Sequence, residues 1–142
     1  MIKMLEPMMS EIQQEAATTR RVLERVPEDK LAWKPHPRSM SLGQLAMHVA
    51  GIPGNISRIA QLEEFDASQA NFDPPAAKSA EELLTALDAS VKAAQEYLGG
   101  VSESAAMGNW RLTSKGKEVF SMRKRLVNYP FAGGWRYGIL GG

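Results

Sequence analysis

The amino-acid sequence predicts an all-α fold, an antiparallel bundle of helices. Apolar residues recur with the spacing of a helix face in three long stretches, within residues 5–26, 42–60 and 83–98. Stripes of this length usually bury one another in a bundle. The chain has 142 residues, which fits one domain, and its one β pattern is a short hairpin near residue 115.

The first helix is expected between Pro7 and Pro27. Proline is tolerated in the first turn of a helix but not in its interior, so the helix begins near one proline and ends before the other. Its apolar face consists of Leu5, Met8, Met9, Ile12, Ala16, Thr19, Leu23 and Val26. Residues 27–38 contain three prolines and predict an extended connection, anchored by its one large aromatic side chain, Trp33.

The second helix is expected to begin at Ser39 or Ser41, because either hydroxyl can accept a hydrogen bond from the first turn. Its apolar face consists of Leu42, Leu45, Ala46, Val49, Ile52, Ile56, Ile59 and Ala60. The pair Pro53-Gly54 interrupts this face, but the spacing continues in phase, which predicts a kink rather than an end. Residues 64–78 are expected to form a long loop.

The third helix is expected to follow Ser79. Glu82 comes three residues later, which is the pattern of a capping box, and Gly99-Gly100 marks the end of the helix. Its apolar face consists of Leu83, Leu84, Leu87, Val91, Ala94 and Leu98. Residues 110–113 and 118–121 flank a turn with Gly116 and predict a hairpin.

The C-terminal stretch has a different composition, which divides the chain into a bundle domain, residues 1–122, and an irregular tail, residues 123–142. The tail holds five glycines, four aromatic residues, four basic residues and no acid. Basic and aromatic residues together are typical of proteins that bind single-stranded nucleic acid. Four charges are few for such a site, and residues 1–122 carry 13 basic and 16 acidic residues, so we expect no nucleic-acid partner.

Composition also limits the chemistry and the location of the chain. The absence of cysteine excludes disulfides, thiolate metal sites and cysteine nucleophiles. No apolar run approaches the roughly 18 residues of a membrane span, and acidic residues come too early for a signal peptide. We therefore expect a cytoplasmic protein without a membrane partner.

Two histidines are the main candidates for chemistry. His48 lies at the edge of the apolar face of the second helix, beside Gln44 and Asn55, where it can bind a metal or form a simple hydrogen bond. No second ligand follows at a typical metal-site spacing, so spacing alone favours the hydrogen bond. His36, within Lys-Pro-His-Pro, is expected to be an exposed loop residue. The pattern identifies no catalytic residue.

Methionines gather in the first third of the chain. The positions are Met4, Met8, Met9, Met40 and Met47. Methionine is an adaptable core residue, which is the interpretation we favour, and the alternative is a flexible apolar surface for a partner.

The segment from Leu31 to Ala50 resembles the DinB-like family. The resemblance rests on Trp33-Lys-Pro35, then Ser41-Leu-Gly-Gln-Leu45, then His48, and it extends over about residues 1–122. It implies a four-helix bundle, often dimeric, with a divalent metal (Zn, Ni, Mn or Fe) held by three histidines, of which His48 is the first. Family members include thiol-dependent transferases and metal-dependent hydrolases, so the implied substrate is a thiol or another small molecule that the sequence does not identify.

The sequence departs from this family after Met122. The family's other two histidines lie on a fourth helix, and residues 123–142 contain no histidine. We interpret the tail as a frameshift or truncation and expect an incomplete metal site. Two functions stay open: a bundle of the metal-dependent transferase or hydrolase type without its full site, or a non-catalytic, interaction-only bundle. A missing fourth helix would expose apolar surface, so we expect a homodimer, or a tail that packs into the gap.

Overall fold

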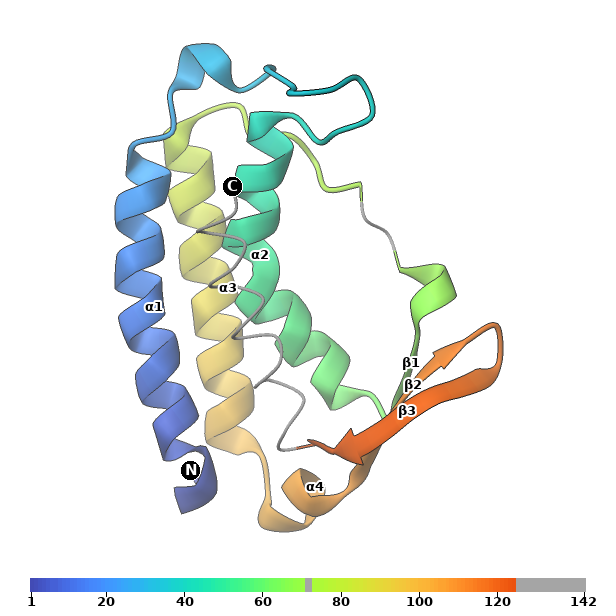
Figure 1. Cartoon of the computed structure of the whole chain (residues 1–142). Helices are drawn as coiled ribbons and strands as arrows, with labels where there is room; N and C mark the ends of the chain where they lie inside the picture. The colour runs from blue at the N-terminus through green and yellow to red at the C-terminus, as the bar shows by residue number, and fades with distance from the viewer. Residues whose placement is uncertain (71–72, 125–142) are drawn as a thin grey trace.

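Three long helices dominate the computed structural model, which describes residues 1–70 and 73–124 (Figure 1). They are α1 (Glu6–Glu24), α2 (Leu42–Gln61) and α3 (Ala80–Gly100). The shorter elements are η1 (Lys3–Leu5), η2 (Glu28–Lys30), β1 (Glu64–Asp66), η3 (Ala67–Gln69), α4 (Glu103–Met107), β2 (Asn109–Ser114) and β3 (Lys117–Arg123). The three strands form one small sheet, so the fold is mostly helical and the prediction of an all-α fold was too narrow. The predicted tail lies outside the described residues, apart from Arg123 and Lys124.

Local sequence signals explain where the long helices begin. Pro7 lies in the first turn of α1. Ser41 caps α2, because its Oγ accepts from the Gln44 N–H at 3.1 Å and the Gln44 Oε1 accepts in return from the Ser41 N–H at 3.0 Å. Ser79 caps α3 by accepting from the Glu82 N–H at 3.1 Å, but the predicted capping box forms only in half, because Glu82 Oε2 accepts from the Lys78 N–H at 3.1 Å and not from the Ser79 N–H. The predicted starts are confirmed, and of the two serines proposed for α2 it is Ser41 that caps the helix.

Helices α2 and α3 are parallel, which corrects the prediction of an antiparallel bundle. Contacts of α2 with α3 and with the chain leading into α3 keep a nearly constant offset along the sequence. A side chain on Gly43 would touch Ala77, one on Gly54 would touch Ser90, and the Tyr97 hydroxyl donates to the Ala60 carbonyl at 3.4 Å. Figure 1 shows that residues 62–70 leave the far end of α2, that residues 73–79 lie near the end where α2 began, and that α1 is antiparallel to both helices. An extended connection of this length can span a whole helix, so apolar spacing alone does not fix helix direction.

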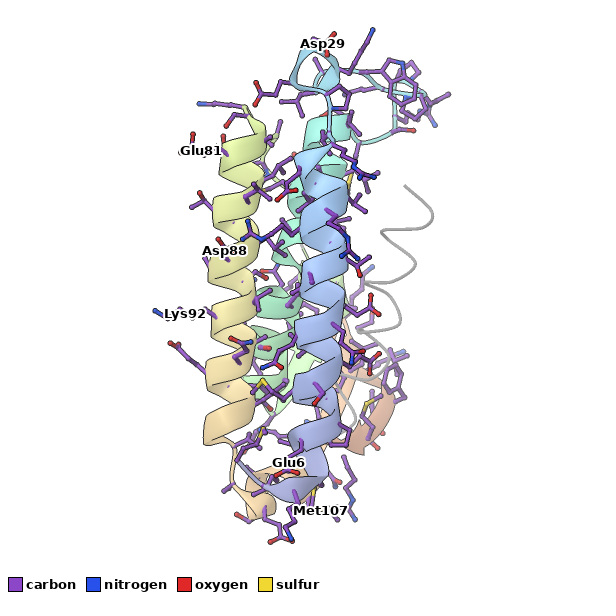
Figure 2. The ribbon with its side chains drawn as sticks, turned by 90° about the vertical axis from the view of Figure 1, so that its left-hand side faces the viewer. Glu6, Asp29, Glu81, Asp88, Lys92 and Met107 are labelled. Carbon is purple, nitrogen blue, oxygen red and sulfur yellow. The ribbon has the colours of Figure 1, made fainter. Side chains whose placement is uncertain are left out.

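Helix α1 packs on α3, and Figure 2 shows these two helices side by side with α2 behind them. Arg20 on α1 forms an ion pair with Asp88 on α3, which raises the pKa of the guanidinium. Two apolar clusters fill the bundle, one with Leu23, Ala46, Val49, Ala50, Ala77, Leu83 and Leu87, the other with Leu5, Met8, Ile12, Ala94 and Leu98. Met8 is buried and Met4, Met9 and Met47 pack against these clusters, in keeping with methionine as a core residue. No described helix is both long and apolar enough to cross a membrane.

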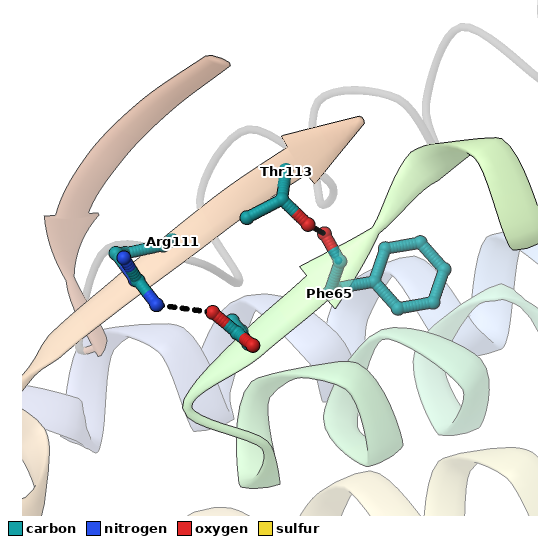
Figure 3. A network of polar contacts seen from close by, with 4 residues as sticks. Phe65, Arg111 and Thr113 are labelled. Carbon is teal, nitrogen blue, oxygen red and sulfur yellow. Dashed lines mark hydrogen bonds and ion pairs between the residues drawn. The ribbon is translucent and has the colours of Figure 1, made fainter. Parts of the chain in front are cut away.

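The sheet consists of the predicted hairpin and one strand that was not predicted. Lys115 and Gly116 form its two-residue turn with φ of 52° and 82°, the left-handed conformation that such turns require. Strand β1 lies parallel to β2, within the segment predicted to be a loop. Arg111 forms an ion pair with the neighbouring Glu64, and the Thr113 hydroxyl donates to the Phe65 carbonyl at 3.4 Å (Figure 3).

Trp110 attaches the sheet to the bundle. Its side chain is 1% exposed and packs with Ala60 at the end of α2 and with Tyr97 on α3. The indole N–H donates to the Ile59 carbonyl at 3.1 Å. Burial in the same cluster raises the pKa of Tyr97.

Asp66 connects the end of β1 to the hairpin turn. Its Oδ1 accepts from the Ser68 N–H at 2.9 Å, the Ser68 hydroxyl at 2.7 Å and the Lys115 N–H at 3.2 Å. These hydrogen bonds, those from Ser68 above all, lower the pKa of Asp66 below its ordinary value of 3.8. The ionised carboxylate therefore stabilises the fold above that value, and its contribution is lost as the pH falls through the lowered pKa.

Replacing Asp66 by asparagine should lower the melting temperature at pH 7. The difference between variant and wild type should begin to shrink below about pH 4 and should disappear once the pH has fallen through the lowered pKa of Asp66, because the wild-type carboxyl is then also protonated. Circular dichroism melts at pH 7 and pH 3 measure the difference, with Asp29→Asn on η2 as a control that removes the same charge elsewhere. A difference of equal size at both pH values would contradict this account.

Candidate functional site

His48 lies on the side of α2 that points away from α3. At 100° per residue it is about 120–140° around the helix from Gly43, Gly54 and Ala60, which contact α3 or the chain leading into it. The same side, an arc of about 80°, holds Leu45, His48, Ile52, Asn55 and Ile59. His48 is half-buried there. Its predicted position at the edge of the apolar face is confirmed.

The polar neighbours expected for His48 do not form a network with it. The Gln44 amide donates to Asp73 Oδ1 at 3.0 Å and to the Pro74 carbonyl at 3.3 Å, while Asn55 Oδ1 accepts from Arg58 at 3.1 Å. Within residues 1–70 and 73–124, no residue forms a hydrogen bond or ion pair with the His48 side chain. The imidazole therefore has no structural partner in this part of the chain.

The donor set does not fit a three-ligand metal site. Among the described residues, no three His, Cys, Asp or Glu side chains lie together in a group that could hold a metal. Residues 71–72 and 125–142 contain none of these four residue types in their sequence. Residues 1–142 thus supply His48 as a possible ligand without the two partners that a Zn, Ni, Mn or Fe site would need.

The loop before α2 places the second histidine in solvent, as predicted. His36 is exposed, and its Nδ1 accepts from the Arg38 N–H at 3.1 Å. Trp33 is not the anchor that the sequence predicted, because its side chain is 58% exposed. Leu31 is the buried residue instead, and its carbonyl accepts from the Gly43 N–H at 2.9 Å. An added side chain on Gly43 would lie 3.2 Å from that carbonyl, so the glycine permits this close approach.

Two shallow hollows follow the line between α2 and α3, and sequence reasoning did not predict them. One measures about 520 Å³ and includes Met47, Glu81 and Glu82; the other measures about 360 Å³ and includes Gly51 and Arg58. Ala89 borders both. Small residues on both helices leave space along the junction of α2 and α3. The close spacing of Gly51 and Gly54 was the one feature of the sequence that could have indicated these hollows. Neither hollow contains a histidine, so they are separate from the His48 surface.

Thr19 is a polar residue on the predicted apolar face of α1. It is 0% exposed, and its hydroxyl has no hydrogen-bond partner among the described residues. A buried unpaired hydroxyl destabilises a fold by about 1–3 kcal/mol. Among the described residues, no other buried side-chain polar atom lacks a hydrogen-bond partner. Thr19 alone does not form a site.

Comparison with known proteins identifies the family. The sequence matches the DinB superfamily over residues 11–126, a range that includes the motif ending at His48. No curated protein and no solved structure gives a significant match. The match extends over most of the chain and confirms the resemblance drawn from the sequence. The chain therefore belongs to the DinB superfamily.

Proposed function

We propose that the chain is a DinB-superfamily bundle of the metal-dependent transferase or hydrolase type whose metal site is incomplete within residues 1–142. The observation that carries the proposal is the isolation of His48. It ends the family motif on α2, yet no group of metal-binding side chains surrounds it among the described residues. A protein metal site of this kind needs about three protein ligands, and a single imidazole holds a metal only weakly. On this proposal residues 1–142 alone do not perform metal-dependent chemistry.

Metal content tests the proposal. The purified chain, incubated in turn with Zn²⁺, Ni²⁺, Mn²⁺ and Fe²⁺ and then desalted, should retain far less than one metal ion per chain. His48→Ala should behave like the wild type, and so should His36→Ala, which removes the exposed histidine. Mass spectrometry of the bound metal gives the stoichiometry. One metal per chain that is lost in His48→Ala but kept in His36→Ala would establish a complete site and overturn the proposal.

A non-catalytic role as a self-associating bundle is the second candidate. It is supported by the α2 surface of Leu45, His48, Ile52, Asn55 and Ile59. Leu45, Ile52 and Ile59 are seven residues apart, the spacing at which helices pair along a seam. Helix α2 packs extensively on α3 but little on α1. Two copies related by a two-fold axis could cover this surface for each other.

Light scattering during gel filtration tests the self-association. We expect the wild type to elute as a dimer and Leu45→Glu to elute as a monomer, because the variant places a charge on the apolar seam. Leu45 is outside the buried clusters, which limits the effect on folding. Met107→Glu on α4 is the matched control, since Met107 is 40% exposed and distant in sequence, and it should stay dimeric. A monomeric wild type excludes the homodimer.

A further inference from the structure

Strand β3 forms an open edge of the sheet. The strand order is β1-β2-β3, so β3 has β2 on one side and no described strand on the other (Figure 1). Residues 117–121 are all exposed, and Val119 and Phe120 are apolar with 58% and 42% exposure. The outer edge of such a strand presents backbone N–H and C=O groups that another strand can pair with.

The hydrogen bonds of β2 show which backbone groups of β3 face outward. The Arg111 N–H donates to the Glu63 carbonyl at 3.1 Å, toward β1, so Arg111 makes no ladder bond with β3. The register shifts after Leu112, which leaves Val119 without a partner on β2, but from Phe120 to Arg123 the pairing is regular. Backbone groups alternate from side to side along this part of the strand, so Trp110 and Leu112 bond with Met122 and Phe120. Ser121 lies opposite Arg111 and therefore directs its N–H and C=O away from β2.

Charge favours an acidic partner over a second copy of this chain. Residues 115–124 hold four basic residues and one acid, Glu118. Two copies of this basic segment would repel each other overall, and a pairing antiparallel about Phe120, for example, would place Lys117 opposite Arg123 of the other copy. A parallel pairing in register would place each lysine beside the same lysine of the other copy, which is also repulsive. Phe120, whose ring centroid lies 6.3 Å from that of Trp110, adds an apolar contact for one side of the incoming strand.

We propose that the outer edge of β3 binds an extended acidic segment of a partner protein as a fourth strand of the sheet. Ser121 provides the outward N–H and C=O, Lys117 and Arg123 attract the acidic residues, and Phe120 contacts an apolar one. Backbone pairing supplies the affinity in this mode of recognition, and the side chains supply the preference for one peptide over another. The proposed contacts use neither His48 nor the α2 residues Leu45, Ile52 and Ile59, so the site does not depend on the function proposed above.

Peptide binding to the full chain tests this site. The probe is a fluorescein-labelled peptide of alternating glutamate and valine, as long as β3, and its control alternates lysine and valine. Fluorescence anisotropy should show saturable binding of the acidic peptide only, weakened by salt. Ser121→Pro removes the outward N–H without removing a bond to β2 and should weaken binding about tenfold. Ser121→Ala keeps that N–H and should bind like the wild type.

Several results would overturn the proposal. They are failure of the acidic peptide to bind, equal binding of the basic peptide, or equal affinity of Ser121→Pro and wild type. A wild-type dimer that Ser121→Pro makes monomeric would also overturn it, by identifying a second copy as the occupant. If circular dichroism shows that Ser121→Pro is unfolded, amide hydrogen exchange on the wild type decides instead. Slower exchange at Ser121 with the acidic peptide supports the site, and unchanged exchange there rejects it.

Discussion

Replacing Trp110 by alanine should destabilise the protein by about 3–5 kcal/mol, the range for removing a large buried aromatic side chain. Trp110 is 1% exposed and fills the space between the sheet and the ends of α2 and α3. Its indole N–H also donates to the Ile59 carbonyl, which would lose this partner in the variant. The loss should therefore combine a cavity with an unpaired polar group, at the point that attaches the sheet to the bundle.

Urea unfolding followed by circular dichroism measures this change in the free energy of unfolding. Trp33→Ala is the matched control, because it makes the same substitution at a residue that is 58% exposed, and it should change stability by less than about 0.5 kcal/mol. Trp110→Phe keeps an aromatic ring but loses the indole N–H, so it should lie between the two. Equal losses for Trp33→Ala and Trp110→Ala would show that Trp110 does not hold the sheet in place.

The parts of the fold that short-range chemistry controls could be predicted from the sequence. Ser41 and Ser79 cap helices because a hydroxyl three residues before a free backbone N–H can accept from it, whatever the rest of the chain does. Pro7 restricts the start of α1 in an equally local way. The hairpin turn needs two residues with positive φ, and Gly116 adopts one of these without strain. In each case the sequence signal and the structure lie within a few residues of each other.

The parts that depend on distant segments could not be predicted. The parallel packing of α2 and α3 follows from where residues 62–79 lead the chain, and apolar spacing carries no information on direction. Strand β1 has three residues, too few to show an alternating pattern, and it exists because β2 pairs with it from 45 or more residues away. The burial of Leu31 in place of Trp33 depends on Gly43, which allows the two backbones to come close.

The candidate site divides in the same way. The motif that ends at His48 was visible in the sequence, and so was the absence of any later histidine. Its half-buried position on the side of α2 away from α3 agrees with the helical spacing. The open edge of β3 could not be singled out from the same pattern, because both strands of a hairpin have an open edge and only the pairing of β1 with β2 shows which of the two edges is closed. The outward direction of the Ser121 backbone likewise follows from the hydrogen bond between Arg111 and Glu63.

Gly54→Val should destabilise the protein by about 2–3 kcal/mol, toward the upper end of the usual effect of overpacking. A Cβ at this position would lie 3.1 Å from both Cα and Oγ of Ser90 and 3.3 Å from its carbonyl oxygen. Two of these three atoms belong to the backbone of α3, so they cannot move aside as a flexible side chain would. The Gly54 N–H also donates to the Ser90 Oγ at 2.7 Å, and a valine that pushes the helices apart would lengthen this bond.

The control for Gly54→Val is Gly99→Val, because an added Cβ at Gly99 would meet no atom within 4 Å. Glycine is the poorer helix former of the two residues, so the control should be neutral or slightly stabilising, within about 0.5 kcal/mol. Urea unfolding of both variants gives the comparison. Since α2 carries His48 and leads into β1, a displaced α2 should also loosen the sheet, with faster amide exchange in β2 for Gly54→Val than for Gly99→Val. If both variants are equally stable, α2 and α3 have room for a side chain at Gly54, and the close contact with Ser90 does not restrict this position.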